Sequence, residues 1–254
     1  MTKNRIPRRT FIKGAASSAG LVLAGCADTE PPSYGNILRM GDALTYQAHR
    51  LLLPRQSLVR EYDYSDISSV PAIGTTNPAD PNKSLYSEEH GPVYERLLRD
   101  HFANWRITVQ GSVFRPQSFS LADLKSLPSR TQITRHTCEE GWSAISQWTG
   151  VPLHQVLAAV GLKPTARYVM LRSYDDWADC IDMLDALHPQ TILAYGMNGR
   201  DLPISHGAPL RIRVERQLGY KSMRFLRSIE LLDEFDDGGK YGNIQNGWSW
   251  YAGI

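Results

Sequence analysis

The pattern of hydrophobic and polar positions becomes regular at residue 105. In WRITVQG, residues 105–111, the side chains of Trp105, Ile107 and Val109 alternate with polar ones, which predicts a half-buried strand. Comparable runs predict further strands over 131–138, 166–173, 191–203, 209–215 and 223–233. The strand at 191–203 is expected to leave through an Asn198-Gly199 turn.

Helical periodicity is confined to two short stretches between these strands. SLADLKSL, residues 120–127, predicts a helix capped by Ser120. GVPLHQVLAAVGL, residues 150–162, predicts a second helix, with Pro152 in its first turn and Gly161 closing it. The sum is an α+β fold, in which a mixed β-sheet core carries short helices.

Outside this core the chain shows little periodicity. Residues 27–104 include SSVPAIGTTNPADPNKS, whose turn-forming composition predicts an irregular segment wrapped around a core of residues 105–254. With part of that wrap, residues 85–254 would form one domain. Five aspartates between 175 and 185 fit no EF-hand spacing and are expected on a solvated helix face. The aromatic tail 238–254 is expected to pack along the surface.

The first 26 residues read as an export signal. Arg8-Arg9 followed by TFIK resembles a twin-arginine motif, and the apolar run 15–24 is too short to span a bilayer. LAGC resembles a lipobox, in which Cys26 would be acylated and would anchor a periplasmic protein to a membrane. An ordinary secretory signal is the alternative. Twin-arginine export carries folded proteins, which gives an indirect hint of a bound cofactor.

Charge and cysteine content exclude several classes of protein. Five of the 28 basic residues fall in the signal, and the remaining 23 face 26 acidic ones, a net charge of −3 for residues 27–254. No basic stripe with interleaved aromatics is present, so nucleic acid is not an expected partner. Three cysteines without a Cys-x-x-Cys pair exclude a disulfide framework, a haem attachment site and an iron–sulfur cluster.

Cys138, in RHTCEEGWS, lies where a predicted strand enters a loop. It can be a packed thiol, a nucleophile activated by His136 or His206, or one ligand of a metal whose other ligands come from a cofactor. Its position favours the last two, since loops carry sites. Glu139 and Glu140 would raise the pKa of the thiol, which argues against a nucleophile.

A basic cluster lies further along the chain. His206, Arg211 and Lys221 fall within sixteen residues, and backbone N–H groups from Gly219 onward could complete an anion-binding nest. The alternative is a solvated strand with surface basic residues. Cys180 is interpreted as a packed residue without a functional partner, and His90, considered by itself, as a structural residue.

RHTCEEGWSAISQWTGVPL, DALHPQTILAYGMNG and HGAPLRIRVERQLGYKSMRFLRSIEL together resemble the molybdopterin-binding domain of the sulfite oxidase superfamily, over roughly residues 85–235. The nearest branch is that of the periplasmic protein-methionine-sulfoxide reductase catalytic subunits. The resemblance implies that Cys138 ligates molybdenum and is catalytic. It implies cofactor contacts for the remaining matched positions: Tyr86, His90, Glu139, Glu140, Ser173, His206, Arg211, Gly219, Tyr220 and Lys221.

The chain departs from the family in three ways. Cys-Glu-Glu-Gly-Trp replaces the Cys-Ala-Gly-Asn-Arg of sulfite oxidases, and paired carboxylates suit dianionic sulfite poorly. The sulfoxide reductase branch usually has Asn where His206 stands. The sequence lacks the carboxy-terminal dimerisation domain of sulfite oxidases, so a monomer is expected.

The resemblance therefore implies an exported molybdenum enzyme that transfers an oxygen atom, in sulfoxide-type reduction, with molybdopterin that carries no nucleotide. Electrons would pass to or from a separate membrane haem protein or cytochrome. Sulfite oxidation is the alternative within the class. A cofactor-free periplasmic binding lipoprotein and a Cys–His hydrolase are alternatives from other classes.

Overall fold

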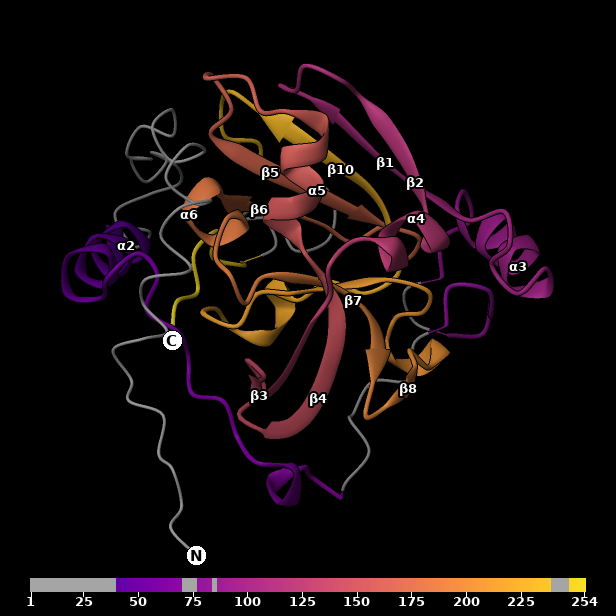
Figure 1. The fold of residues 1–254 in the computed structure, drawn as a ribbon, viewed down its shortest axis with the longest axis horizontal. Coiled ribbons are helices and arrows are strands. Elements are labelled where there is room, and N and C mark those ends of the chain that lie inside the picture. Colours follow the sequence, from indigo (N-terminus) through magenta and orange to yellow (C-terminus); the bar gives the residue numbers. More distant parts are fainter. Residues whose placement is uncertain (1–39, 70–76, 84–85, 239–246) are drawn as a thin grey trace, which may run out of the picture.

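The computed structural model describes residues 40–69, 77–83, 86–238 and 247–254. The predicted signal 1–26 and its Cys26 lie outside these residues. Figure 1 shows strands filling the centre of the molecule, with α2 and α3 on opposite sides. The helices are α2 (Met40–Leu52), α3 (Gly91–Arg99), α4 (Leu121–Ser126), α5 (Leu153–Val160) and α6 (Met183–Ala186), with short 3-10 turns η2 (Tyr64–Asp66), η3 (Ile204–His206) and η4 (Gly219–Lys221). In the part of the chain described, none of these helices has the length and apolarity needed to cross a membrane.

Within the described residues, the strands form two five-stranded sheets. The first has the order β2 (Gln117–Ser120), β1 (Arg106–Gly111), β10 (Leu226–Leu232), β5 (Tyr168–Ser173) and β6 (Ala178–Asp182). β1 and β10 run parallel and the other pairs antiparallel, so this sheet is mixed. The second contains β3 (Arg130–Thr137), β4 (Ser143–Pro152), β7 (Ile192–Met197) and β8 (Arg200–Asp201), with β9 (Arg211–Arg213) also paired to β7. The predicted mixed-sheet α+β fold is confirmed.

Apolar side chains from both sheets and α5 share one core. It includes Ile107, Val169 and Ile229 from the first sheet, Val151 and Ile212 from the second, and Leu153, Val156, Leu157 and Val160 from α5. The helical spacing of the α5 residues thus turns one face inward, as predicted. Both sheets are therefore held in a fixed relation, which positions the loops that follow their strands.

Most predicted elements are confirmed, together with their local signals. Ser120 caps α4, where its Oγ accepts from the Asp123 N–H at 3.0 Å. Asn198 and Gly199 both have positive φ in the turn between β7 and β8. Gly161 ends α5 with φ at 71°. One boundary is wrong: residues 150–152 belong to β4, because their backbone pairs with β7, and the helix begins at Leu153.

The prediction that residues 27–104 are irregular missed two helices. α2 is held by its Tyr46, whose ring lies 5.2 Å from that of Trp250 and 5.0 Å from that of Tyr251. α3 is held by buried Tyr94, whose hydroxyl donates to the Ala208 carbonyl at 2.7 Å. Tertiary contacts therefore stabilise these two helices, which have 13 and 9 residues and would be marginal in isolation. The domain boundaries stay a prediction.

The prediction of a solvated acidic helix at 175–185 is also wrong. The segment contains strand β6, and Asp175, Asp179, Asp182 and Asp185 are buried. These carboxylates can be buried because they have partners: Lys221 for Asp179, and an Arg50 guanidinium 2.8 Å from Asp182. Asp182 also caps α6, accepting from the Asp185 N–H at 2.8 Å. Cys180 is buried in this segment, as the packing interpretation predicted.

Candidate functional site

A cavity of about 360 Å³ lies beyond the end of β3, and its walls come from the second sheet and from loops that include those before β6 and before β10. It brings together seven of the predicted site residues: Cys138, Glu139, Glu140, His206, Arg211, Gly219 and Tyr220. These residues come from three separate stretches of sequence. The fold therefore places the three motifs around a single cavity.

Cys138 enters the cavity from a tight loop. The Cys138 N–H donates to the Trp142 carbonyl at 2.9 Å, and Gly141 turns the chain with φ at 92°. The Cys138 Sγ lies 3.4 Å from Glu139 Oε2 and 4.0 Å from Glu140 Oε2. Burial, with a contribution from these carboxylates, raises the pKa of Cys138 to about 11. The thiol is therefore protonated at neutral pH without a metal, which disfavours the hydrolase alternative.

Arg211, on β9, forms the opposite wall. Its Nη1 donates to the His206 carbonyl at 3.1 Å and its Nη2 to the Ser222 carbonyl at 2.7 Å, while the guanidinium lies 4.8 Å from the Trp148 ring centroid. Arg211 is buried, so the solvated-strand alternative is wrong for this residue. Its Nε has no hydrogen-bond partner among the described residues.

Guanidinium groups gather around Arg211 on this wall. Burial, then the charges of Arg213 and Arg224, lower the pKa of Arg211 well below its usual value. Arg213 is balanced by Glu215, at 3.0 and 2.8 Å, and Arg224 interacts electrostatically with Asp175 and Glu139. Because burial and its arginine neighbours oppose the charge of Arg211, an anion bound beside it in the cavity would stabilise that charge.

His136, on β3, presents a fixed hydrogen-bond donor. Arg213 Nη1 donates to His136 Nδ1 at 2.7 Å, so the neutral ring must carry its proton on Nε2. Burial, then the nearby arginines, lower the pKa of His136 to about 2. The His136 ring also packs against Gly219, where a β-carbon would collide with Nε2, so this position requires glycine.

Four residues named by the resemblance do not line the cavity. Lys221 is fully buried, with its Nζ 2.5 Å from Asp179 Oδ1. Ser173 donates to the Asp175 carboxylate, beside the cavity wall. His90 Nε2 lies 3.8 Å from Asp176 Oδ1, and the Tyr86 ring packs on Gly91. Of these four, Ser173 contacts a residue that lines the cavity, Asp175.

Other lining residues were not predicted as cofactor contacts. They include the run Ser222, Met223 and Arg224, the aromatic side chains Trp142, Trp148, Trp177 and Trp248, and His136, considered earlier only as a partner of the thiol. The run directly follows the Gly-Tyr-Lys loop, and its arginine was a usable signal. The tryptophans are scattered in sequence and gave no such signal.

These residues fit molybdopterin. The arginines suit its phosphate, and the unpartnered Arg211 Nε is a donor available to it. The described residues contain no group of three or more His, Cys, Asp and Glu side chains that could hold a metal. A metal bound at Cys138 would therefore take most of its ligands from an organic cofactor, as molybdopterin provides.

Comparisons with known proteins agree with this chemistry. The family model described as "Oxidoreductase molybdopterin binding domain" matches residues 90–239. A protein of Azospira oryzae that bears the name protein-methionine-sulfoxide reductase subunit YedZ1 is 32% identical over 97% of this chain and 87% of its own length. The protein-methionine-sulfoxide reductase catalytic subunit MsrP of Xanthomonas axonopodis pv. citri is 28% identical over 91% of this chain and 71% of its own length.

Among solved structures, the sulfane dehydrogenase SoxCD of Paracoccus pantotrophus matches 52% of this chain and 39% of its own, with 22% identity and a TM-score of 0.49. The family model spans more than half of the chain, and the first relative spans nearly all of it. The chain belongs to the family of oxidoreductases with a molybdopterin-binding domain.

Proposed function

We propose that this oxidoreductase reduces sulfoxides, methionine sulfoxide in particular, with Cys138 as the protein's ligand to molybdenum. The observation that carries the proposal is that the Cys138 thiol and the buried Arg211 guanidinium face one cavity. When bound, the molybdenum centre supplies oxygen-atom transfer and the accompanying two-electron redox change. The protein supplies the thiolate, the binding contacts and the electrostatic surroundings.

Each wall of the cavity would have a separate task. Arg211 and Arg224 would hold the cofactor phosphate, and His136 would donate its Nε2 hydrogen to the bound group. Glu140 is held by Trp142, whose Nε1 donates to it at 2.8 Å, so its negative charge stays beside the thiol. Tyr86, His90, Ser173 and Lys221 would support the cavity from outside.

The surroundings of the thiol favour a neutral substrate. Glu139 and Glu140 lie within 4.0 Å of Cys138 Sγ, where they would repel dianionic sulfite and leave a neutral sulfoxide unaffected. Met197 and the aromatic side chains of Trp142 and Trp248 offer apolar contacts for a thioether chain. Both protein relatives carry the name of a protein-methionine-sulfoxide reductase.

Sulfite oxidation is the second candidate, because the buried arginines could also bind an oxyanion. Membership of a cofactor-binding family decides against the cofactor-free binding lipoprotein. Protein matured in a molybdenum-competent host should oxidise a reduced viologen dye with methionine sulfoxide and should not reduce cytochrome with sulfite. Sulfite turnover without sulfoxide turnover would reverse the assignment.

A charge-neutral double variant tests the role of the carboxylates. Glu139→Gln with Glu140→Gln should tighten inhibition by sulfite tenfold or more, since each removed charge lowers Coulomb repulsion by about 1 kcal/mol or more at this range. The matched control is Glu234→Gln, an exposed glutamate outside the cavity. Unchanged inhibition in the double variant would show that the carboxylates do not select the substrate.

A separate electron-transfer protein completes the proposal. Both relatives are named as subunits, which supports a membrane haem protein or a cytochrome as the partner. Twin-arginine export to the periplasm, acylation of Cys26 and a monomeric state are part of the same proposal. Mass spectrometry of the amino-terminal peptide tests acylation, and an unmodified Cys26 in mature protein would remove the lipid anchor.

A further inference from the structure

Exposed apolar side chains gather on α2 and the segment after it. Nine large hydrophobic side chains are exposed in the described residues, and six of them fall within residues 40–58: Met40, Leu44, Leu51, Leu52, Leu53 and Leu58. Leu51 is 85% exposed and Leu52 is 74% exposed. Exposed leucines are ordinary when scattered, whereas a cluster of this size marks a contact surface.

The helix carries its apolar residues on the outer face. Met40, Leu44 and Leu51 stand at i, i+4 and i+11, which places them along one stripe of the helix. Tyr46 and Arg50 point the other way, toward the body of the protein. α2 is therefore amphipathic, with its apolar stripe directed away from the core.

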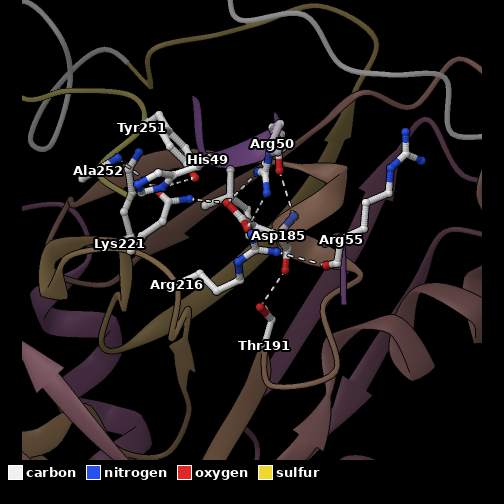
Figure 2. A network of polar contacts seen from close by, with 12 residues as sticks. His49, Arg50, Arg55, Asp185, Thr191, Arg216, Lys221, Tyr251 and Ala252 are labelled. Carbon is white, nitrogen blue, oxygen red and sulfur yellow. Dashed lines mark hydrogen bonds and ion pairs between the residues drawn. The ribbon is translucent and has the colours of Figure 1, made fainter. Parts of the chain in front are cut away.

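Polar contacts fix this orientation. Arg50 Nη2 lies 2.8 Å from Asp182 Oδ2 and 3.1 Å from Asp185 Oδ2, and its guanidinium lies 4.7 Å from the Tyr46 ring centroid. Figure 2 shows Arg50 reaching down to Asp185, beside the contact between His49 and Tyr251, which measures 3.1 Å. Because Arg50 is held by buried carboxylates, α2 cannot rotate about its axis to bury its leucines without breaking these ion pairs.

The charges near the stripe indicate what covers it. Residues 51–60 hold two basic residues, Arg55 and Arg60, and no acidic residue, whereas Arg50 is paired inward with Asp182 and Asp185. Arg55 and Arg60 are exposed beside Leu53 and Leu58. Leucines flanked by arginines are typical of a segment that lies in the interface of an anionic membrane. The predicted lipid site Cys26 lies fourteen residues before Met40, a reach of at most about 50 Å.

We propose that the outer face of residues 40–58, the α2 apolar surface, docks into the headgroup region of a membrane that contains anionic lipid. The carboxy-terminal tail would link this surface to the cavity. Ser249 Oγ donates to Asp42 of α2 at 2.9 Å, and the Ser249 carbonyl accepts from the Tyr220 hydroxyl at 2.7 Å. Tyr220 lines the cavity, so α2 and the cavity share this support.

Hydrogen–deuterium exchange of the full chain tests the docking locally. Vesicles of phosphatidylcholine with about one-third phosphatidylglycerol should slow exchange across residues 40–53, and phosphatidylcholine alone should slow it less. Exchange around Phe114, which is 65% exposed far along the sequence, should stay unchanged. Leu44→Gln with Leu51→Gln should abolish the protection and weaken vesicle binding about tenfold or more, whereas Phe114→Gln should retain both.

Docking of α2 and acylation of the amino terminus are read out separately. Wild type and variants share the same amino terminus, so the difference between them reports α2, and acylation of Cys26 is read separately by mass spectrometry. All the substituted side chains are exposed, so molybdenum content should not change. The inference is overturned if vesicles leave exchange of residues 40–53 unaffected. It is equally overturned if the protection arises only with a second copy of the chain or only with a haem protein.

Discussion

Lys221→Met is expected to destabilise the protein because it removes the partner of a buried carboxylate. The Lys221 Nζ is fully buried, 2.5 Å from Asp179 Oδ1 and 3.1 Å from the Cys180 carbonyl. Breaking a buried ion pair from one side costs about 3–5 kcal/mol, since the remaining charge has no compensation. For a chain of this length that corresponds to a fall in melting temperature of about 6–20 °C.

The loss should depend on pH with a definite sign. Burial raises the pKa of Asp179 to about 6 even beside Lys221, and removal of the lysine should raise that pKa further. A carboxyl whose pKa is higher in the folded protein contributes stability at low pH and loses it as pH rises. The variant should therefore be closest to wild type at pH 5 and should fall behind as the pH rises above 6.

Urea unfolding at the two pH values measures the effect. Lys125→Met is the matched control, because its ion pair with Asp201, at 3.1 Å, is exposed and should contribute less than about 1 kcal/mol. If Lys221→Met leaves the free energy of unfolding unchanged but releases the cofactor, Lys221 is a direct cofactor contact and the structural explanation is wrong.

Two further substitutions probe the cavity wall. Gly219→Ala should displace the His136 ring and lower the amount of retained cofactor, measured as molybdenum per folded protein, about tenfold or more. Gly41→Ala, which has open space around it, should not change cofactor retention. Full retention in Gly219→Ala would contradict the packing of His136 on Gly219. Burial lowers the pKa of His206 to about 4, so the free energy of unfolding of cofactor-free protein should fall by up to about 3 kcal/mol as the pH falls from 6.5 toward 4. His206→Asn should reduce this acid-dependent loss, while His101→Asn, an exposed control, should not. An acid limb that is identical in wild type and His206→Asn would refute the assignment.

The sequence predicted elements whose burial follows a simple period. β1 and α5 were found because alternate or helically spaced apolar positions face the core. β6 was missed because its aspartates read as a solvated face, and only the fold supplies the lysine and arginine that neutralise them. α2 was missed because its apolar stripe faces outward, which no pattern of core-directed residues describes.

The candidate site divides along similar lines. Cys138, His206 and Arg211 were found because they belong to contiguous motifs, and the fold brings those motifs to one cavity. Lys221 was placed with its neighbours in the same motif, yet its side chain turns to the other side of the wall. The direction of a side chain in an irregular loop depends on long-range partners. A sequence match therefore predicts where the residue lies along the chain better than it predicts what its side chain contacts.

The central claim is that the Cys138 sulfur binds molybdenum, and X-ray absorption at the molybdenum edge tests it most directly. Cys138→Ser should yield folded protein that retains cofactor through the arginine wall, with one sulfur ligand fewer than wild type and no sulfoxide turnover. An unchanged sulfur count in loaded Cys138→Ser protein would contradict the account.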